Sequence, residues 1–155
     1  MAEELKIAHG GKQECYDLLY RQVVTLLNGE SDKIANMANV AAMIHYTLRP
    51  LWTGFYRVEG DELVLGPFQG PLACSRIGYG KGVCGTAWQS MQTIVVEDVE
   101  LFPGHIACSS LSRSEIVVPV LHGEEVVAVL DIDSTEVGTF DDTDREWLER
   151  IVALM

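Results

Sequence analysis

The pattern of apolar and polar residues begins with two helical segments. Between residues 13 and 28, apolar side chains recur at the spacing of one helix face, and Asn28-Gly29 is typical of a helix end. Ser31 is placed to cap a second helix that stops before Pro50. The apolar face predicted for this second helix comprises Ile34, Met37, Ala41, Ile44 and Leu48. We therefore expect two helices in succession before the first strand.

After Pro50 the pattern changes to that of short strands. The elements predicted next are strands at 52–58 and 62–66, a loop at 67–80, a short helix at 83–90 and a strand at 93–96. Gly60-Asp61 is a hairpin signal between the first two strands. Cys74 falls in the loop and Cys84 in the first turn of the short helix. A helix N-terminus would lower the pKa of that thiol if the sulfur pointed at the free amides.

The last part of the chain predicts two more strands and a final helix. The apolar runs 117–120 and 126–130 flank the turn signal His122-Gly123-Glu124. Asp141 is a helix cap, supported by Asp144 and Glu146 near the positive end of the helix. The residues that this helix is expected to bury are Trp147, Ile151 and Leu154. This order of elements indicates an α+β fold with an antiparallel sheet, and the length favours one domain over residues 1–155.

The glycine-rich turn at residues 80–85 matches the spacing G-x-G-x-x-G literally. In dinucleotide-binding proteins this motif follows a parallel strand and opens the helix of a βαβ unit. The segment before Gly80 is a predicted loop, so that context is missing. We interpret the turn as a tight entry into the short helix, and we expect no bound cofactor.

The net charge of the chain limits the kinds of partner that it can bind. A net charge of -12 at pH 7 argues against a surface that binds phosphates, and therefore against nucleic acid or an anionic membrane as a partner. No apolar run approaches the roughly 20 residues of a membrane span, and the first residues lack the basic and apolar regions of a signal peptide. We expect a cytoplasmic protein.

The chain has four cysteines, at positions 15, 74, 84 and 108. In a reducing compartment they should not form a structural disulfide framework, so each is buried, metal-bound or redox-active. Cys15 is most simply a structural residue. The spacing fits no paired Cys-x-x-Cys zinc pattern, and although His105 near Cys108 could complete a ligand set, we expect no bound metal.

Acidic and aromatic residues occupy positions where a core strand would be apolar. Asp131 and Asp133 are two residues apart, so in a strand they project from the same face. Such acids either end the strand in a solvated loop or take part in a site, because burying them without a partner is costly. Trp52 and Tyr56 also share one face of their strand, as ordinary core or as the floor of a small pocket.

Thiols, carboxyls and aromatic rings together suit one class of reaction. A thiolate attacks electrophiles, including sulfur, and a second thiol within reach resolves the product to a disulfide. A carboxyl whose pKa is raised by burial donates a proton, and a carboxylate binds an ammonium group. The residues therefore favour thiol-dependent reduction of a small cationic substrate. A hydrolase is disfavoured because the chain lacks a Gly-x-Ser-x-Gly elbow.

Seven short motifs make the chain resemble a known enzyme family. They are Trp52-Thr-Gly-Phe-Tyr56, Leu65-Gly-Pro-Phe-Gln-Gly70, Ala73-Cys74, Gly82-Val-Cys84-Gly-Thr-Ala, His105-Ile-Ala-Cys108, Ser112-Arg-Ser-Glu115-Ile-Val-Val-Pro119 and Leu130-Asp-Ile-Asp-Ser134. Together they resemble the free methionine-(R)-sulfoxide reductases, which are stand-alone GAF-domain enzymes. The resemblance covers nearly the whole chain and implies a GAF-like antiparallel sheet of about six strands flanked by helices, a closed pocket and a homodimer.

The resemblance also implies a role for each reactive residue. Cys108 matches the nucleophile, Cys74 the resolving cysteine, and Cys84 a third cysteine able to join disulfide exchange. Ser109 stands where family members often carry Asp. The family's pocket carboxyls, which serve as general acid or bind the substrate amine, correspond to Glu115, Asp131 and Asp133, and its aromatic wall to Trp52 and Tyr56. The resemblance does not say which carboxyl is the acid.

The implied reaction is reduction of free methionine-(R)-sulfoxide to methionine. It would pass through a sulfenic acid and an intramolecular disulfide, with thioredoxin as the external reductant. The alternative is a GAF domain without enzymatic activity, which senses either a small ligand or redox state through the same cysteines.

Overall fold

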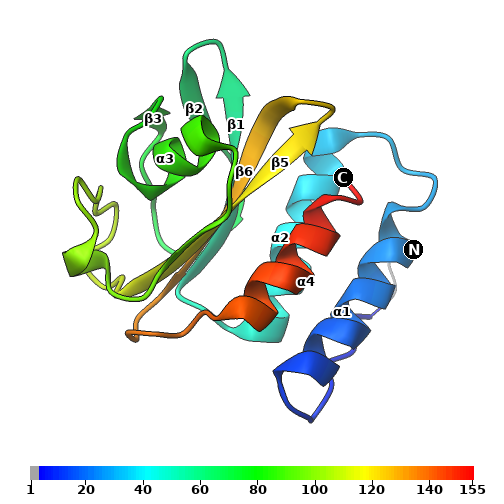
Figure 1. The fold of residues 1–155 in the computed structure, drawn as a ribbon. Coiled ribbons are helices and arrows are strands. Elements are labelled where there is room, and N and C mark those ends of the chain that lie inside the picture. The colour runs from blue at the N-terminus through cyan, green and yellow to red at the C-terminus, as the bar shows by residue number, and fades with distance from the viewer. Residues whose placement is uncertain (1–3) are drawn as a thin grey trace.

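The computed structural model describes residues 4–155, which form one six-stranded antiparallel sheet with helices on both faces (Figure 1). The elements in chain order are α1 (Lys12–Leu27), α2 (Lys33–Leu48), β1 (Trp52–Glu59), β2 (Glu62–Gln69), β3 (Arg76–Gly78), α3 (Gly82–Ser90), β4 (Ile94–Val96), the 3-10 helix η1 (Val99–Leu101), β5 (Ser114–His122), β6 (Glu125–Ser134) and α4 (Asp142–Val152). The strand order is β3-β2-β1-β6-β5-β4. The expected fold class, α+β with an antiparallel sheet, is confirmed.

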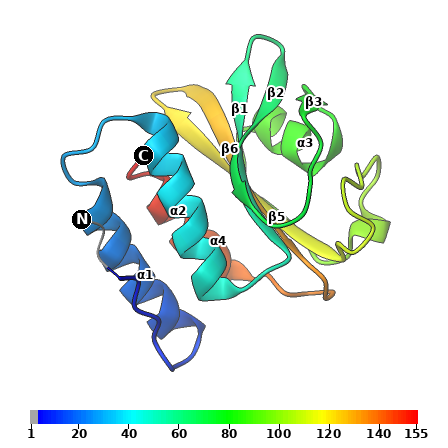
Figure 2. The ribbon, with the colours of Figure 1, turned by 180° about the vertical axis from the view of Figure 1, so that it is seen from behind.

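The two faces of the sheet carry different layers. α2 and α4 pack against one face with α1 outside them, whereas α3 and the long segment before β5 lie over the other face (Figures 1 and 2). We call the second face the front. Side chains alternate accordingly along β6, where Leu130 and Ile132 point to the helices and Val129 points to the front. The same alternation puts Phe55 of β1 on the helix side and Tyr56 on the front, as predicted.

The apolar faces predicted for α2 and α4 each include one residue that is exposed. Ile34 is 50% exposed because the buried stripe of α2 begins only at Met37. Leu154 is 37% exposed because α4 ends at Val152, so the helical period no longer directs this side chain inward. Within residues 4–155, none of the helices has both the length and the apolar composition that crossing a bilayer demands.

Two predicted boundaries also need correction. Asp32, not Ser31, caps α2, and its carboxylate accepts a hydrogen bond from the Ala35 amide at 2.8 Å. The segment 67–80 is not wholly a loop, since it contains the end of β2 and the short strand β3. β3 has only one apolar residue, the buried Ile77, so no alternating pattern marks it in the sequence.

A buried carboxylate connects the first helix to the last. Asp144, 1% exposed, accepts hydrogen bonds from the Tyr16 hydroxyl at 2.6 Å and from Lys12 Nζ at 2.5 Å. It also accepts from the Asp141 amide at 2.9 Å, which completes a capping box at the start of α4. Burial and the neighbouring Asp144 raise the pKa of Tyr16, so its hydroxyl keeps the proton that it donates. The predicted cap is confirmed, and it holds α1 and α4 together as well.

We expect Tyr16→Phe to lower the free energy of unfolding by about 1.5–3 kcal/mol, because a hydrogen bond to a buried charged group is lost. Urea denaturation of wild type and variant measures the difference. Tyr20→Phe is the matched control, since the Tyr20 ring also contacts Trp147 but its hydroxyl is not bonded to Asp144. Equal losses in the two variants would contradict the role given to this hydrogen bond.

Candidate active site

Three acidic side chains converge at the centre of the front face. Glu115 on β5 pairs directly with Asp133 on β6, and Asp131 lies two residues before Asp133 on the same strand. Cross-strand partners project from one face with their Cβ atoms about 5 Å apart. Glu115 is 5% exposed and Asp131 is 6% exposed. Because β6 continues as a strand through Ser134, the alternative of a strand end in a solvated loop is wrong for these acids.

Burial and the lack of a Lys or Arg partner among the described residues determine the pKa values of these three carboxyls. Among residues 4–155, no Lys or Arg forms an ion pair with the three carboxyls, and the nearest basic group is His105, whose Nε2 lies 3.5 Å from Glu115 Oε1. Burial, and then the neighbouring Asp133, raises the pKa of Glu115 to about 8. Burial and the adjacent carboxyls likewise raise the pKa values of Asp131 and Asp133. The cluster therefore retains protons at neutral pH.

The two aspartates differ in their hydrogen bonding. The Ser112 hydroxyl donates a hydrogen bond to Asp133 Oδ1 at 3.0 Å. Asp131 Oδ1 is buried and has no hydrogen-bond partner within the described residues. A buried acceptor without a partner is costly, so its presence beside a cavity points to a donor supplied by a ligand.

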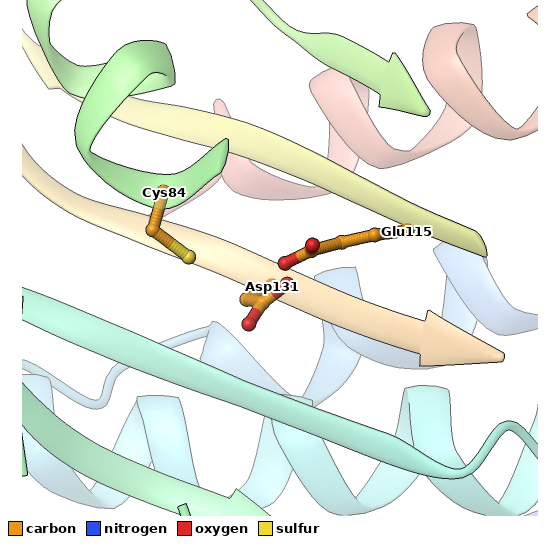
Figure 3. A group of neighbouring side chains, drawn as sticks. All are labelled: Cys84, Glu115 and Asp131. Carbon is orange, nitrogen blue, oxygen red and sulfur yellow. The ribbon is translucent and has the colours of Figure 1, made fainter. Parts of the chain in front are cut away.

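Cys84 extends the acidic cluster with a thiol. One donor atom from each of Cys84, Glu115 and Asp131 lies within 4.8 Å of the others, and the three side chains point toward one another from α3, β5 and β6 (Figure 3). Burial, and then the nearby Asp131, raises the pKa of the Cys84 thiol. The condition for a lowered thiol pKa, a sulfur stabilised by the helix amides, is therefore not met. Its position in the first turn of α3 is as predicted.

A disulfide joins Cys74 to Cys108, with their Cα atoms 5.5 Å apart. Cys74 lies between β2 and β3, and Cys108 lies between η1 and β5, so the bond links two loops that are 34 residues apart in sequence. Both cysteines are half-buried. Cys15 and Cys84 are free. The bonded pair is the one that the family resemblance assigns as nucleophile and resolving cysteine.

The aromatic residues line the pocket and also hold the loop that carries Cys74. Trp52 stacks on Tyr56 and on Phe68, with ring centroids 5.9 and 5.3 Å apart. The Trp52 indole donates to the Pro71 carbonyl at 3.1 Å, and the Tyr56 hydroxyl donates to the Cys74 carbonyl at 2.9 Å. Gly54 permits this arrangement, because a Cβ there would collide with the Trp52 ring.

One cavity brings the predicted site residues together. The predicted residues that line it are Trp52, Tyr56, Cys84, Cys108, Glu115, Asp131 and Asp133, and Cys74 adjoins it through the disulfide. Lining residues to which sequence reasoning gave no role include Leu72, Lys81, Ile106 and Ser112, while His105 was considered only as a metal ligand. These residues come from loops and turns, whose side-chain directions no periodic pattern reveals. Trp52 and Tyr56 are buried in the core of the front face and also line the cavity, so their role in binding stays a prediction.

The glycine-rich turn leads into α3 beside this cavity, as predicted. Gly80 and Gly82 have φ values of 71° and 59°, and the Gly80 amide donates to the Gly85 carbonyl at 3.1 Å. A Cβ on Gly85 would collide with the Gly78 carbonyl oxygen. The spacing of the glycines is thus explained by a tight turn and by the close approach of β3 to α3.

Comparison with known proteins gives consistent results. The GAF domain family model matches residues 38–155. The chain is 52% identical to "GAF domain-containing protein A" of Dictyostelium discoideum, covering 100% of this chain and 99% of that protein. It is 48% identical to "Free methionine-R-sulfoxide reductase" of Escherichia coli, covering 92% and 87%. Among solved structures, the free methionine-R-sulfoxide reductase of Neisseria meningitidis in complex with its substrate superimposes with a TM-score of 0.95 at 46% identity, covering 97% and 92%.

The buried carboxyls predict a specific dependence of stability on pH. Glu115 has a pKa of about 8 in the folded protein against an ordinary value of 4.5, so between these pH values the folded state holds a proton that the unfolded chain has released. The free energy of unfolding should therefore fall as pH rises through this window, by about 1.4 kcal/mol per pH unit for one carboxyl.

Urea midpoints between pH 5 and 8.5 test this prediction, with Glu115→Gln expected to flatten the decline. Glu124→Gln is the matched control, because Glu124 is exposed in the turn between β5 and β6. A decline that is as steep in Glu115→Gln as in wild type would show that the raised pKa of Glu115 is not its cause.

Proposed function

The chain belongs to the GAF-domain family and, within it, to the free methionine-R-sulfoxide reductases, and on this premise we propose that it reduces free methionine-(R)-sulfoxide to methionine. It would do so as an oxidoreductase whose own thiols supply the two electrons. The single observation that carries the proposal is the Cys74–Cys108 disulfide beside a cavity lined by three carboxyls, of which Glu115 and Asp131 are buried and Asp133 is half-buried. Such a cavity offers a thiol, a proton donor and an acceptor for an amine together.

Substrate binding rests on the acidic cluster and the aromatic wall. The buried oxygen of Asp131 that has no partner would accept a hydrogen bond from the substrate ammonium. Asp133 or Glu115 would share that charge, since both are within the same cluster. A methionine inside a polypeptide lacks a free ammonium group, so this contact favours the free amino acid. The Trp52 ring would pack against the substrate methyl group.

The chemical step transfers oxygen from substrate sulfur to a cysteine. In the reduced enzyme, the Cys108 sulfur attacks the sulfoxide sulfur while a protonated carboxyl of the cluster gives its proton to the sulfoxide oxygen. The bond between the two sulfurs and the sulfur–oxygen bond of the substrate then break while a sulfur–oxygen bond to Cys108 forms, so two electrons pass to the substrate, methionine leaves, and Cys108 becomes a sulfenic acid. Cys74 then attacks the Cys108 sulfur, water leaves, and the Cys74–Cys108 disulfide forms.

The three carboxyls differ in pKa and in hydrogen-bond partners, and these differences suggest separate roles. The raised pKa of Glu115, about 8, keeps it protonated at neutral pH, and His105 lies close enough to return a proton after the step. Asp133 is held by Ser112, and Asp131 is free to accept. This division favours Glu115 as the acid and Asp131 as the amine ligand, with Asp133 in support. Cys84 is buried and free, so it would join disulfide exchange only after a rearrangement.

Turnover requires an external reductant for the disulfide. We propose thioredoxin, a dithiol that reduces disulfides by exchange. The half-buried state of Cys74 and Cys108 is compatible with attack by a partner thiol. A cytoplasmic location would keep thioredoxin reduced and available. The homodimer and the cytoplasmic location remain predictions.

A coupled assay tests the function directly. We expect NADPH oxidation when the protein is mixed with thioredoxin, thioredoxin reductase and free methionine-(R)-sulfoxide. The (S) epimer and a peptide-bound sulfoxide should give at most background rates, because the first misplaces the oxygen and the second lacks the ammonium. If no substrate gives turnover with fully reduced cysteines, the chain is better described as a GAF sensor of a small ligand. If peroxide alone forms the disulfide, a redox sensor is favoured.

Substitution of single cysteines separates their roles. Cys108→Ser should abolish methionine formation, because the hydroxyl is a poor nucleophile here. Cys74→Ser should retain a burst of about one methionine per chain but lose cycling with thioredoxin, because the sulfenic acid is not resolved. Cys15→Ser is the matched control, since Cys15 lies on α1 behind the sheet and should leave turnover unchanged.

Rapid-quench measurement of methionine and steady-state NADPH oxidation distinguish these outcomes. Full activity of Cys108→Ser would exclude it as the nucleophile. Unimpaired cycling of Cys74→Ser would transfer the resolving role to Cys84.

A further inference from the structure

The front-face cluster contains a set of donor atoms that suits a metal ion. One atom from each of Cys84, Glu115 and Asp131, a sulfur and two oxygens, lies within 4.8 Å of the others (Figure 3). Atoms bound to one zinc ion lie somewhat closer than this, given Zn–S distances of about 2.3 Å and Zn–O distances of about 2.0–2.2 Å. Small side-chain rotations would therefore bring all three into range. Each residue is on a different element, so the geometry is held by the fold and not by one flexible segment.

A second observation shows that the cluster lacks a positive partner. Asp131 Oδ1 is buried without a hydrogen bond, in a side chain that is 6% exposed and lines the cavity. Among residues 4–155, no Lys or Arg forms an ion pair with Glu115, Asp131 or Asp133. Ionising this cluster without a partner is costly, so a cation that enters the cavity can take the place of the protons that the cluster holds.

We propose that this cluster binds one zinc ion per chain through Cys84, Glu115 and Asp131, in direct competition with the ammonium group of the amino-acid substrate. The competition rests on the proposed function, because both ligands would need the carboxylate of Asp131. Metal binding itself does not, since it follows from the donor atoms alone. A reductase with zinc in this position could not admit its substrate, so zinc would act as an inhibitor.

The chemistry of the donors selects the kind of metal. Zinc takes Cys, His, Asp and Glu ligands and accepts three protein ligands with one open position. Magnesium and calcium prefer oxygen ligands only, and magnesium also demands near-octahedral geometry. A buried sulfur in the set therefore favours zinc and its spectroscopic substitute cobalt over both. Further donors beside this cluster are the carboxyl of Asp133, which pairs with Glu115 across the sheet, and His105, whose Nε2 lies 3.5 Å from Glu115 Oε1.

Zinc binding is tested on the oxidised protein, so that Cys74 and Cys108 are paired and the free thiols are Cys15 and Cys84. Competition against a chromophoric chelator should reveal one zinc per chain, unaffected by a large excess of magnesium or calcium. Cobalt should give the near-ultraviolet absorption of a thiolate-to-metal charge transfer. Free methionine-(R)-sulfoxide should displace either metal.

Matched variants identify the ligands. Cys84→Ser should abolish the cobalt band and weaken zinc binding by at least about 100-fold, since even residues outside the ligand shell change metal affinity by 10–100-fold. Cys15→Ser should change neither. Glu115→Gln should weaken zinc binding while the cobalt band remains at saturating metal. Circular dichroism confirms that each variant is folded.

Absence of stoichiometric zinc at micromolar concentrations in wild type would overturn the proposal, as would a cobalt band that is lost in Cys15→Ser and kept in Cys84→Ser. These results are independent of turnover. Zinc binding without turnover in the coupled assay would support the metal site and refute the proposed activity. Turnover without zinc binding would support the activity and refute the metal site. Zinc that the sulfoxide does not displace would refute the competition.

Discussion

The gathering of three carboxyl groups, two of them buried, and a buried thiol on one face of the central sheet is the constraint on which the rest of the structure depends. The register of β1, β6 and β5 produces it: Asp131 faces Gly54 on one side and Val117 on the other, while Asp133 lies between Trp52 and Glu115. Such a cluster opposes folding, because no basic side chain in residues 4–155 apart from His105 approaches it within ion-pair distance. The opposite face compensates with an apolar core between the sheet and α2 and α4, extended by α1 through Asp144. The helix layer thus stabilises a sheet whose front is adapted to binding.

The enclosure of the cluster depends on loops that are tied down from two directions. Hydrogen bonds from Trp52 and Tyr56 reach the backbone of the segment that carries Cys74, and the disulfide connects that segment to the loop of Cys108 and His105. The disulfide therefore joins the two segments that border the cavity. Reduction of the disulfide would remove the covalent link between these two segments.

Sequence patterns predicted the parts of this structure that are periodic. Alternation placed Asp131 with Asp133, and Trp52 with Tyr56, on common faces, and turn residues located the two central hairpins correctly. Periodicity could not show that Glu115 lies opposite Asp133, because register depends on tertiary pairing; the resemblance to a family supplied that grouping. Ser112, His105 and Lys81 reach the cavity from irregular segments, where no period fixes the direction of a side chain. The thiol of Cys84 illustrates a different limit. Its helix position was foreseen, but the nearby carboxyls and burial, which decide its pKa, were not.

Charge balance links the binding and the chemistry of the proposed reaction. One substrate ammonium would bring a single positive charge to a site with three adjacent carboxyl groups, so it cannot stabilise all of them in ionised form. At least one carboxyl then keeps its proton while the substrate is bound, and reduction of a sulfoxide consumes a proton at the departing oxygen. A divalent zinc ion in the same place changes this balance, because it neutralises two negative charges and displaces the ammonium. In the proposed reaction, the excess of acids over cations would therefore store the proton that the sulfoxide oxygen needs.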